Sequence, residues 1–123
     1  GRIKFLMINT NAIEYDYSEP VPDFDFLETE VKKDSALFDR TIVCMHAAPY
    51  SEQFNNNVAK PFNHYMQFYP GLMFCLYGHG HHTEEHDIFE NGTIYYEVAS
   101  VEKREYRIFT ITPKGYSNEV ISF

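Results

Sequence analysis

The stretch from Leu72 to His82, LMFCLYGHGHH, carries the most information about the fold and function of this chain. An uncharged and mostly apolar run, typical of a buried strand, ends abruptly at Gly78, and histidines and glycine then follow. Neutral imidazole is a common metal ligand, and glycine permits tight turns and close approach of the backbone to an ion. We therefore expect a strand that places His79 and His81 at the rim of a sheet as metal ligands. A histidine-rich surface turn is the alternative.

Two earlier apolar runs, RIKFLMIN at 2–9 and RTIVCM at 40–45, are also typical of buried strands. Residues 23–34 and 58–69, which lie between the three strands, place apolar side chains at helical spacing. A β-α-β-α-β order predicts roughly parallel neighbouring strands with the helices on one face. The side chains expected to face inward from the helices are Phe24, Leu27, Val31, Phe62, Met66 and Tyr69.

After Glu85 the pattern changes to short alternating runs separated by turn residues. Such a pattern predicts successive strands joined as an antiparallel β-meander. The strands expected are 87–90, 93–100, 105–112 and 116–123. With 123 residues, the whole chain is predicted to form a single α/β domain.

Composition excludes several classes of function. A formal net charge of −8 disfavours a surface that binds nucleic acid by neutralising phosphates. No apolar stretch approaches the length of a membrane span, so we expect no membrane association. Cys44 and Cys75 each lie within an apolar strand pattern and are interpreted as buried free thiols. Free thiols favour a reducing compartment such as the cytoplasm.

His46 directly follows the second predicted strand, much as His79 follows the third. The carboxyl ends of parallel strands lie at one edge of a sheet, where ligands collect. We therefore expect His46 and His79 on the same rim, although a core histidine is the alternative for His46 taken alone. Residues two apart in an extended segment point to the same side, so His79 and His81 could reach one ion or two neighbouring ions.

A second metal motif overlaps the first. The segment at 82–86, HTEEH, fits the H-x-x-E-H pattern, in which two histidines and a glutamate lie on one helix. The glycines before it and the strand pattern after it leave no room for such a helix, so these residues are expected at the rim or in solvent. In the loop that follows His46, Tyr50 and Asn55 are candidate substrate contacts. His64 is expected at the surface.

The segments VCMHAAP at 43–49 and YGHGH at 77–81 together resemble the last two motifs of the calcineurin-like metallophosphoesterases. The first strand, the helices between the motifs and the later hairpins also resemble that family, so the resemblance covers nearly the whole chain. It implies the C-terminal half of a four-layer α/β/β/α sandwich. It also implies that His46 and His79 bind one metal of a dinuclear centre and that His81 binds the other. The implied reaction is hydrolysis of a phosphate mono- or diester by a metal-activated water, with two divalent ions such as Mn, Fe or Zn.

The chain departs from the family because it lacks the upstream Asp-x-His, Gly-Asp-x-x-Asp and Gly-Asn-His motifs. The remaining ligands and the catalytic groups, which are unknown, are expected before Gly1. Three imidazoles alone cannot hold two hard ions, which also require carboxylate oxygens. We therefore expect this chain alone to bind one ion or none and to be inactive.

The expected partners are the missing N-terminal half of the same domain and a phosphoester substrate. Absence of that half should expose a sheet face and cause self-association. The alternative is a non-catalytic binding module in which His46, His79 and His81 hold a single ion or none.

Overall fold

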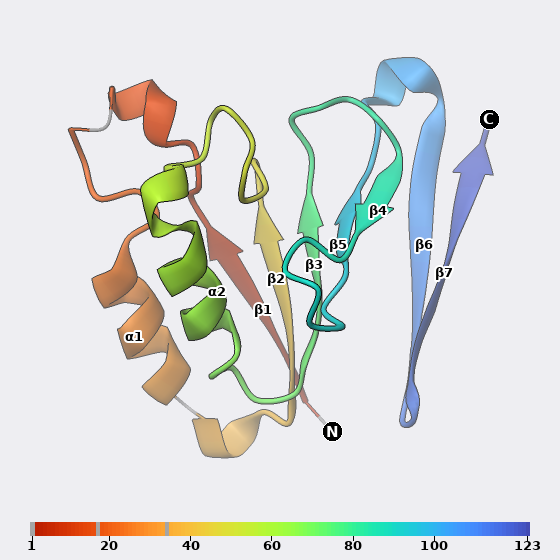
Figure 1. Cartoon of the computed structure of the whole chain (residues 1–123). Helices are drawn as coiled ribbons and strands as arrows, with labels where there is room; N and C mark the ends of the chain where they lie inside the picture. The colour runs from red at the N-terminus through yellow and green to blue at the C-terminus, as the bar shows by residue number, and fades with distance from the viewer. Residues whose placement is uncertain (1, 17, 34) are drawn as a thin grey trace.

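The computed structural model describes residues 2–16, 18–33 and 35–123. A five-stranded sheet has the order β1-β2-β3-β5-β4, with two helices on one face and a separate β-hairpin on the other (Figure 1). Four of its strands run parallel and β4 is antiparallel to β5. The strands of this sheet are β1 (Ile3–Ile8), β2 (Arg40–Met45), β3 (Leu72–Tyr77), β4 (Glu84–His86) and β5 (Tyr95–Glu97).

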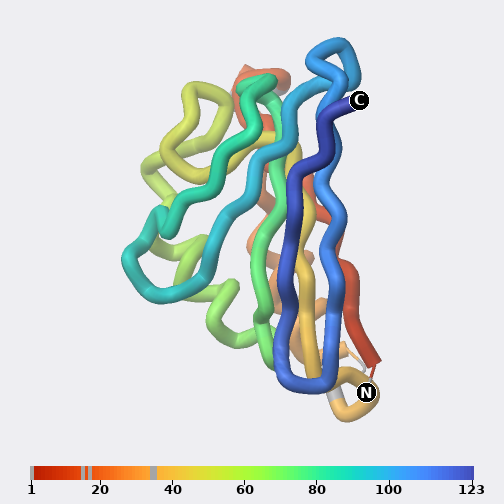
Figure 2. The backbone as a smooth tube through the Cα atoms, turned by 90° about the vertical axis from the view of Figure 1, so that its right-hand side faces the viewer, coloured from red at the N-terminus to blue at the C-terminus, as the bar shows by residue number. Residues whose placement is uncertain are grey.

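The remaining elements cover the two faces of the sheet. The helices are α1 (Phe24–Lys32) and α2 (Ala59–Met66), and the hairpin consists of β6 (Glu105–Thr112) and β7 (Gly115–Ser122). Figure 2, turned by 90°, shows the hairpin in blue in front of the main sheet, with the helices behind it. Short 3-10 turns connect these elements at Ala12–Tyr15 (η1), Ser35–Leu37 (η2), Asn56–Val58 (η3) and Val101–Lys103 (η4).

The strands bury apolar side chains on both faces. Toward the helices, alternate residues of β1 and β2 pack against the inner faces of α1 and α2. The strand residues are Leu6, Ile8, Val43 and Met45, and the helix residues include Leu27 and Phe62. Toward the hairpin, the ring of Phe74 stacks on that of Phe109 with centroids 4.5 Å apart. The hydroxyls of Tyr96 and Tyr116 are 2.9 Å apart in the same layer. The hairpin therefore serves as the third layer of the fold.

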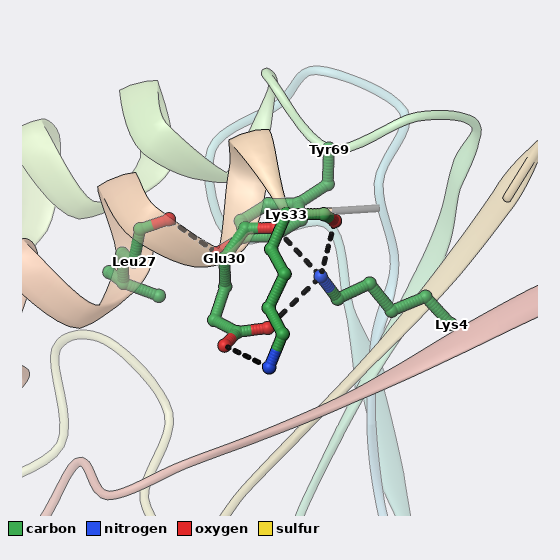
Figure 3. Close-up of polar contacts among 5 residues, drawn as sticks. All are labelled: Lys4, Leu27, Glu30, Lys33 and Tyr69. Atoms are coloured by element: carbon green, nitrogen blue, oxygen red, sulfur yellow. Dashed lines mark hydrogen bonds and ion pairs between the residues drawn. The ribbon is translucent and has the colours of Figure 1, made fainter. Parts of the chain in front are cut away.

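A group of polar contacts attaches α1 to the sheet (Figure 3). The ammonium of Lys4 donates to the backbone carbonyl of Glu30 at 2.7 Å and lies 3.1 Å from its carboxylate. Lys33 reaches the same carboxylate at 3.8 Å. The buried hydroxyl of Tyr69, which follows α2, donates to the carbonyl of Leu27 on α1 at 2.8 Å. These contacts fix α1 against both β1 and the segment that follows α2.

The β-α-β-α-β half of the prediction is confirmed, with parallel strands and both helices on one face. The predicted inward-facing side chains are also confirmed. Leu27, Phe62, Met66 and Tyr69 are buried, and Phe24 and Val31 are half-buried against the same core.

The predicted antiparallel meander is present only in part. An antiparallel pair forms there, but its first strand is β4 at 84–86 and not 87–90. Residues 87–90 form a turn, in which the Asp87 carboxylate accepts from the backbone of Asn91 at 3.0 Å and of Gly92 at 2.9 Å. On its other side β5 pairs in parallel with β3, so it belongs to the main sheet and does not pair with β6 as a meander requires. All three of its residues are buried, as expected for a strand covered on both faces. The predicted hairpin at the end of the chain is confirmed as β6 and β7.

Part of the sheet remains uncovered beside the hairpin. Phe5 is 56% exposed and Met7 is 65% exposed on the edge strand β1. In the register of the sheet they pair with Ile42 and Cys44. Ile42 is buried beneath the hairpin, whereas Cys44 is only partly buried. An apolar strip thus lies open on the face opposite the helices.

None of the helices in the described ranges combines the length and apolar character needed to cross a bilayer.

Candidate metal centre

The carboxyl ends of β2 and β3 bring His46 and His79 together. His46 follows the last residue of β2, and a hydrogen bond of 3.0 Å from the backbone N–H of Gly78 to the His46 carbonyl joins the two strand ends. The imidazole rings of His46 and His79 lie edge to face, with centroids 5.2 Å apart and planes inclined by 66°. His46 is exposed, whereas the side chain of His79 is 23% exposed. The predicted shared rim is therefore present.

This separation fits two imidazoles on one ion. Metal–nitrogen bonds of about 2.1 Å place an ion about 3 Å from the ring centre, so two rings at a tetrahedral angle have centroids about 5 Å apart. The observed 5.2 Å agrees with that value. His46 and His79 therefore have the chemistry and the spacing to act as two ligands of a single divalent metal.

The backbone after β3 is left-handed at the histidines and not at the glycines. His79 has φ 63° and His81 has φ 59°, whereas neither Gly78 nor Gly80 has positive φ. The expected extended geometry of this segment is therefore wrong, and the period-two argument that placed His79 and His81 on one side does not apply. Left-handed backbone at a non-glycine residue costs about 1–3 kcal/mol and is often found at functional sites.

Glu52 forms a short contact with His79 that the sequence analysis missed. Its Oε1 lies 2.6 Å from His79 Nε2, and the hydrogen bond from His79 lowers the pKa of the Glu52 carboxyl below its ordinary value. With an ionised Glu52, the Nε2–H donates and Nδ1 is left as the nitrogen available to a metal. Histidine ligands commonly donate their other N–H to a carboxylate in this way. No feature of the sequence identifies Glu52 as a site residue, because its partner His79 lies in a different loop.

His81 does not complete a three-ligand group with the histidine pair in the described part of the chain. Its side chain is exposed, and the described residues contain no group of three or more His, Cys, Asp or Glu side chains able to hold a metal ion. His46, His79 and His81 therefore do not close a three-ligand site. The residues present fit two ligands of one ion, but they do not fit a complete dinuclear centre.

The two candidate substrate contacts lie in different environments. Tyr50 is 54% exposed, and its ring centroid is 5.7 Å from that of Phe89. Asn55 is half-buried and caps η3, where its side-chain oxygen accepts from the backbone of Asn57 at 3.3 Å. Asn55 thus has a structural role in the loop, while Tyr50 presents its ring to solvent.

The overlapping H-x-x-E-H motif does not lie on a helix. Residues 84–86 form β4, and His86 and Glu84 are exposed partners 2.9 Å apart. His82 is exposed too, as expected for a rim residue. His64 is likewise exposed on α2, where its ring contacts Phe68 with centroids 4.9 Å apart.

A cavity of about 400 Å³ lies beside His79. Its polar lining includes Ser51, Glu52, Tyr77 and Glu97. Sequence reasoning did not identify Glu97, which is 3% exposed and follows two buried tyrosines in β5.

No family model, curated protein or solved structure matches the chain. The resemblance to calcineurin-like metallophosphoesterases therefore stays a prediction from sequence motifs. What supports a function is the geometry of the two histidines and their surroundings.

Proposed function

We propose that His46 and His79 bind one divalent metal and that the chain forms part of a calcineurin-like metallophosphoesterase, with His81 as a ligand of a second ion. The observation that carries this proposal is the placement of two imidazoles 5.2 Å apart at the carboxyl ends of adjacent parallel strands. Bound divalent ions in such a centre would activate a water and neutralise charge on a phosphoester.

The other residues of the rim position these ligands. Glu52 orients the His79 ring through the 2.6 Å contact at Nε2 and leaves Nδ1 for the metal. The left-handed backbone at His79 and His81 fixes where the two side chains leave the chain. The exposed ring of Tyr50 is a candidate surface for the organic part of a phosphoester.

The proposed centre is incomplete within this chain. Hard divalent ions require carboxylate oxygens, and the described residues do not place a third ligand beside His46 and His79. A groove of about 370 Å³ connects the open apolar strip at Met7 and Cys44 with His46. We propose that a further polypeptide segment, expected upstream, covers this strip and carries the missing ligands. The result would be the four-layer α/β/β/α sandwich that the sequence motifs predict.

The test is metal content by mass spectrometry together with hydrolysis of a chromogenic phosphodiester in Mn²⁺. We expect the histidine pair to bind at most one ion weakly and the chain to show no turnover until the complementary upstream segment is added. With Co²⁺, which favours imidazole, His46→Asn should abolish the bound metal, whereas the surface control His64→Asn should retain it. Co²⁺ content that is independent of His46 would refute the proposal. Two tightly bound ions with turnover in this chain alone would refute its incompleteness.

The second candidate function is a non-catalytic binding module that holds one ion or none. It is favoured by the lack of a three-ligand metal group among residues 2–16, 18–33 and 35–123. If the complementary segment binds and metal is retained but no phosphoester is hydrolysed, this second function is the correct one.

A further inference from the structure

Glu97 is a buried carboxylate without an ionic partner in the described part of the chain. The residue is 3% exposed, and its Oε2 is buried with no hydrogen-bond partner. Arg107 contacts Glu97, but its Nε donates to the backbone carbonyl at 3.4 Å and not to the carboxylate. Removing an ionised carboxylate from water is costly unless it is paired. A cation beside the Glu97 carboxylate would therefore stabilise it.

The neighbours of Glu97 add negative charge. Across the sheet, Glu97 pairs with Tyr77 on β3 and with Glu84 on β4. Two carboxylates directly opposite each other on neighbouring strands are destabilising. Glu97 is therefore buried opposite a second carboxylate, and the nearby Arg107 guanidinium is used by the backbone carbonyls of Glu97 and Glu84.

The cavity beside His79 provides further oxygen donors. Besides Glu97, it is lined by Ser51, whose buried Oγ has no hydrogen-bond partner, and by Glu52. Gly80 covers the carboxylate, because a Cβ at that position would clash with Glu97 Oε2. Glycine at 80 thus leaves room for a charged group that the structure otherwise leaves unsatisfied.

We propose that this cavity binds a hard divalent cation of the Ca²⁺ or Mg²⁺ class. The Glu97 carboxylate is the charged ligand, the Ser51 hydroxyl is a neutral ligand, and Glu52 lies at the cavity wall. Such ions prefer carboxylate, hydroxyl and water oxygens. A water molecule could satisfy the hydrogen bonds of Glu97 and Ser51, but it would not neutralise the charge.

The inference does not depend on a metal bound by the histidines, because oxygen donors and not imidazoles form this site. With one fully buried carboxylate, we expect a dissociation constant on the order of 10⁻⁴–10⁻³ M, at the weak end of protein Ca²⁺ sites.

The first experiment titrates the chain with Tb³⁺, a luminescent hard-ion probe that nearby tyrosines sensitise. Because Tyr77 lines the cavity, we expect tyrosine-excited Tb³⁺ emission that Ca²⁺ competes away. Glu97→Gln should raise the apparent dissociation constant by about tenfold or more. The control is Glu85→Gln, an exposed carboxylate on β4 that pairs with Tyr96, and it should bind as the unaltered chain does. Equal Tb³⁺ binding by Glu97→Gln and Glu85→Gln would overturn the proposal.

A second variant and a melting measurement distinguish loss of the cation site from loss of the fold. Gly80→Ala keeps both carboxylates but fills the space at Glu97 Oε2, so it should also lose the Tb³⁺ emission. In chelator, Glu97→Gln should melt at a higher temperature than the unaltered chain, because it removes a buried carboxylate whose Oε2 has no hydrogen-bond partner. Ca²⁺ should raise the melting temperature of the unaltered chain and leave that of Glu97→Gln unchanged. The same melting temperature in Ca²⁺ and chelator for the unaltered chain would contradict the proposal.

Binding of Co²⁺, which favours imidazole, separates the two metal sites. Glu97→Gln should retain Co²⁺ binding at His46 and His79, and His46→Asn should retain Tb³⁺ emission. Failure of one site therefore leaves the other proposal standing.

Discussion

Nε2 of His79 lies 2.6 Å from Oε1 of Glu52, so a carboxylate from the loop after β2 orients a histidine that follows β3. The orientation of the His79 ring depends on both residues. The hydrogen bond joins the two loops that line the rim of the sheet, and it selects which ring nitrogen of His79 remains available for a ligand.

Replacing Glu52 should weaken metal binding without removing a ligand. We expect Glu52→Gln to lower Zn²⁺ affinity by about 10–100-fold, the usual effect of losing a carboxylate that orients a histidine ligand. Calorimetric titration of Zn²⁺ measures the change, and the exposed Glu90→Gln is the matched control. Unchanged affinity in Glu52→Gln would show that the contact has no role in the site.

The left-handed backbone at His79 predicts an inverted order of stability between glycine and alanine. Because glycine adopts positive φ without steric cost, His79→Gly should be about 0.5–1 kcal/mol more stable than His79→Ala. At His82, where φ is not positive, alanine should be at least as stable as glycine. Urea unfolding of the four variants tests this, and a more stable alanine at both positions would contradict the assigned backbone conformation.

Alkaline pH should destabilise the fold. Burial raises the pKa of the Cys75 thiol from 9.0 to about 12, and the hydroxyl of Tyr77 rises from 10.0 to about 12. A raised native pKa contributes stability that is complete below the unfolded value and is lost as pH rises toward the native value. The free energy of unfolding should therefore fall by on the order of a few kcal/mol between about pH 9 and 12. Urea titrations across this range measure the fall.

The Cys75→Ala variant isolates the thiol contribution. Its stability should decline less steeply above pH 9, the ordinary pKa of a thiol, than that of the unaltered chain. Parallel curves for the two proteins would exclude Cys75 as a source of the alkaline sensitivity.

The open apolar strip predicts self-association. Phe5 and Met7 are 56% and 65% exposed on an edge strand, and edge strands with apolar surface pair readily with other chains. Light scattering after size-exclusion chromatography should show a mass that increases with concentration, and Met7→Lys should reduce that increase. Leu37→Lys, at another exposed apolar position, should not. A clean monomer at every concentration would be evidence against this interface.

The sequence predicted the first half of the fold because each element there has a distinct periodicity. Strands such as 40–45 are continuous apolar runs bounded by polar residues, and the helices repeat apolar residues at the period of a turn. The prediction for the second half differs from the structure at 93–100. The strand β5 in this run pairs antiparallel with β4 as a hairpin strand, but it also pairs in parallel with β3 and does not pair with β6. Two adjacent buried tyrosines in β5 do not alternate, and this is the signature of a strand covered on both faces.

Only the part of the candidate site that follows from the strand order could be predicted from the sequence. His46 and His79 follow neighbouring parallel strands, so their shared edge follows from the strand order alone. Glu52 and Glu97 reach the same region through contacts between separate loops and strands, which no spacing in the sequence encodes. The left-handed backbone at His81 likewise depends on how the loop closes.

The most direct test of the central claim is the imidazole NMR spectrum during titration with substoichiometric Co²⁺. If His46 and His79 bind one ion, their ring resonances shift and broaden together, while those of the exposed His64 do not. His46→Asn should then abolish the response of His79. A His79 response that persists without His46, or equal broadening at His64, would contradict a shared metal at the carboxyl edge of the sheet.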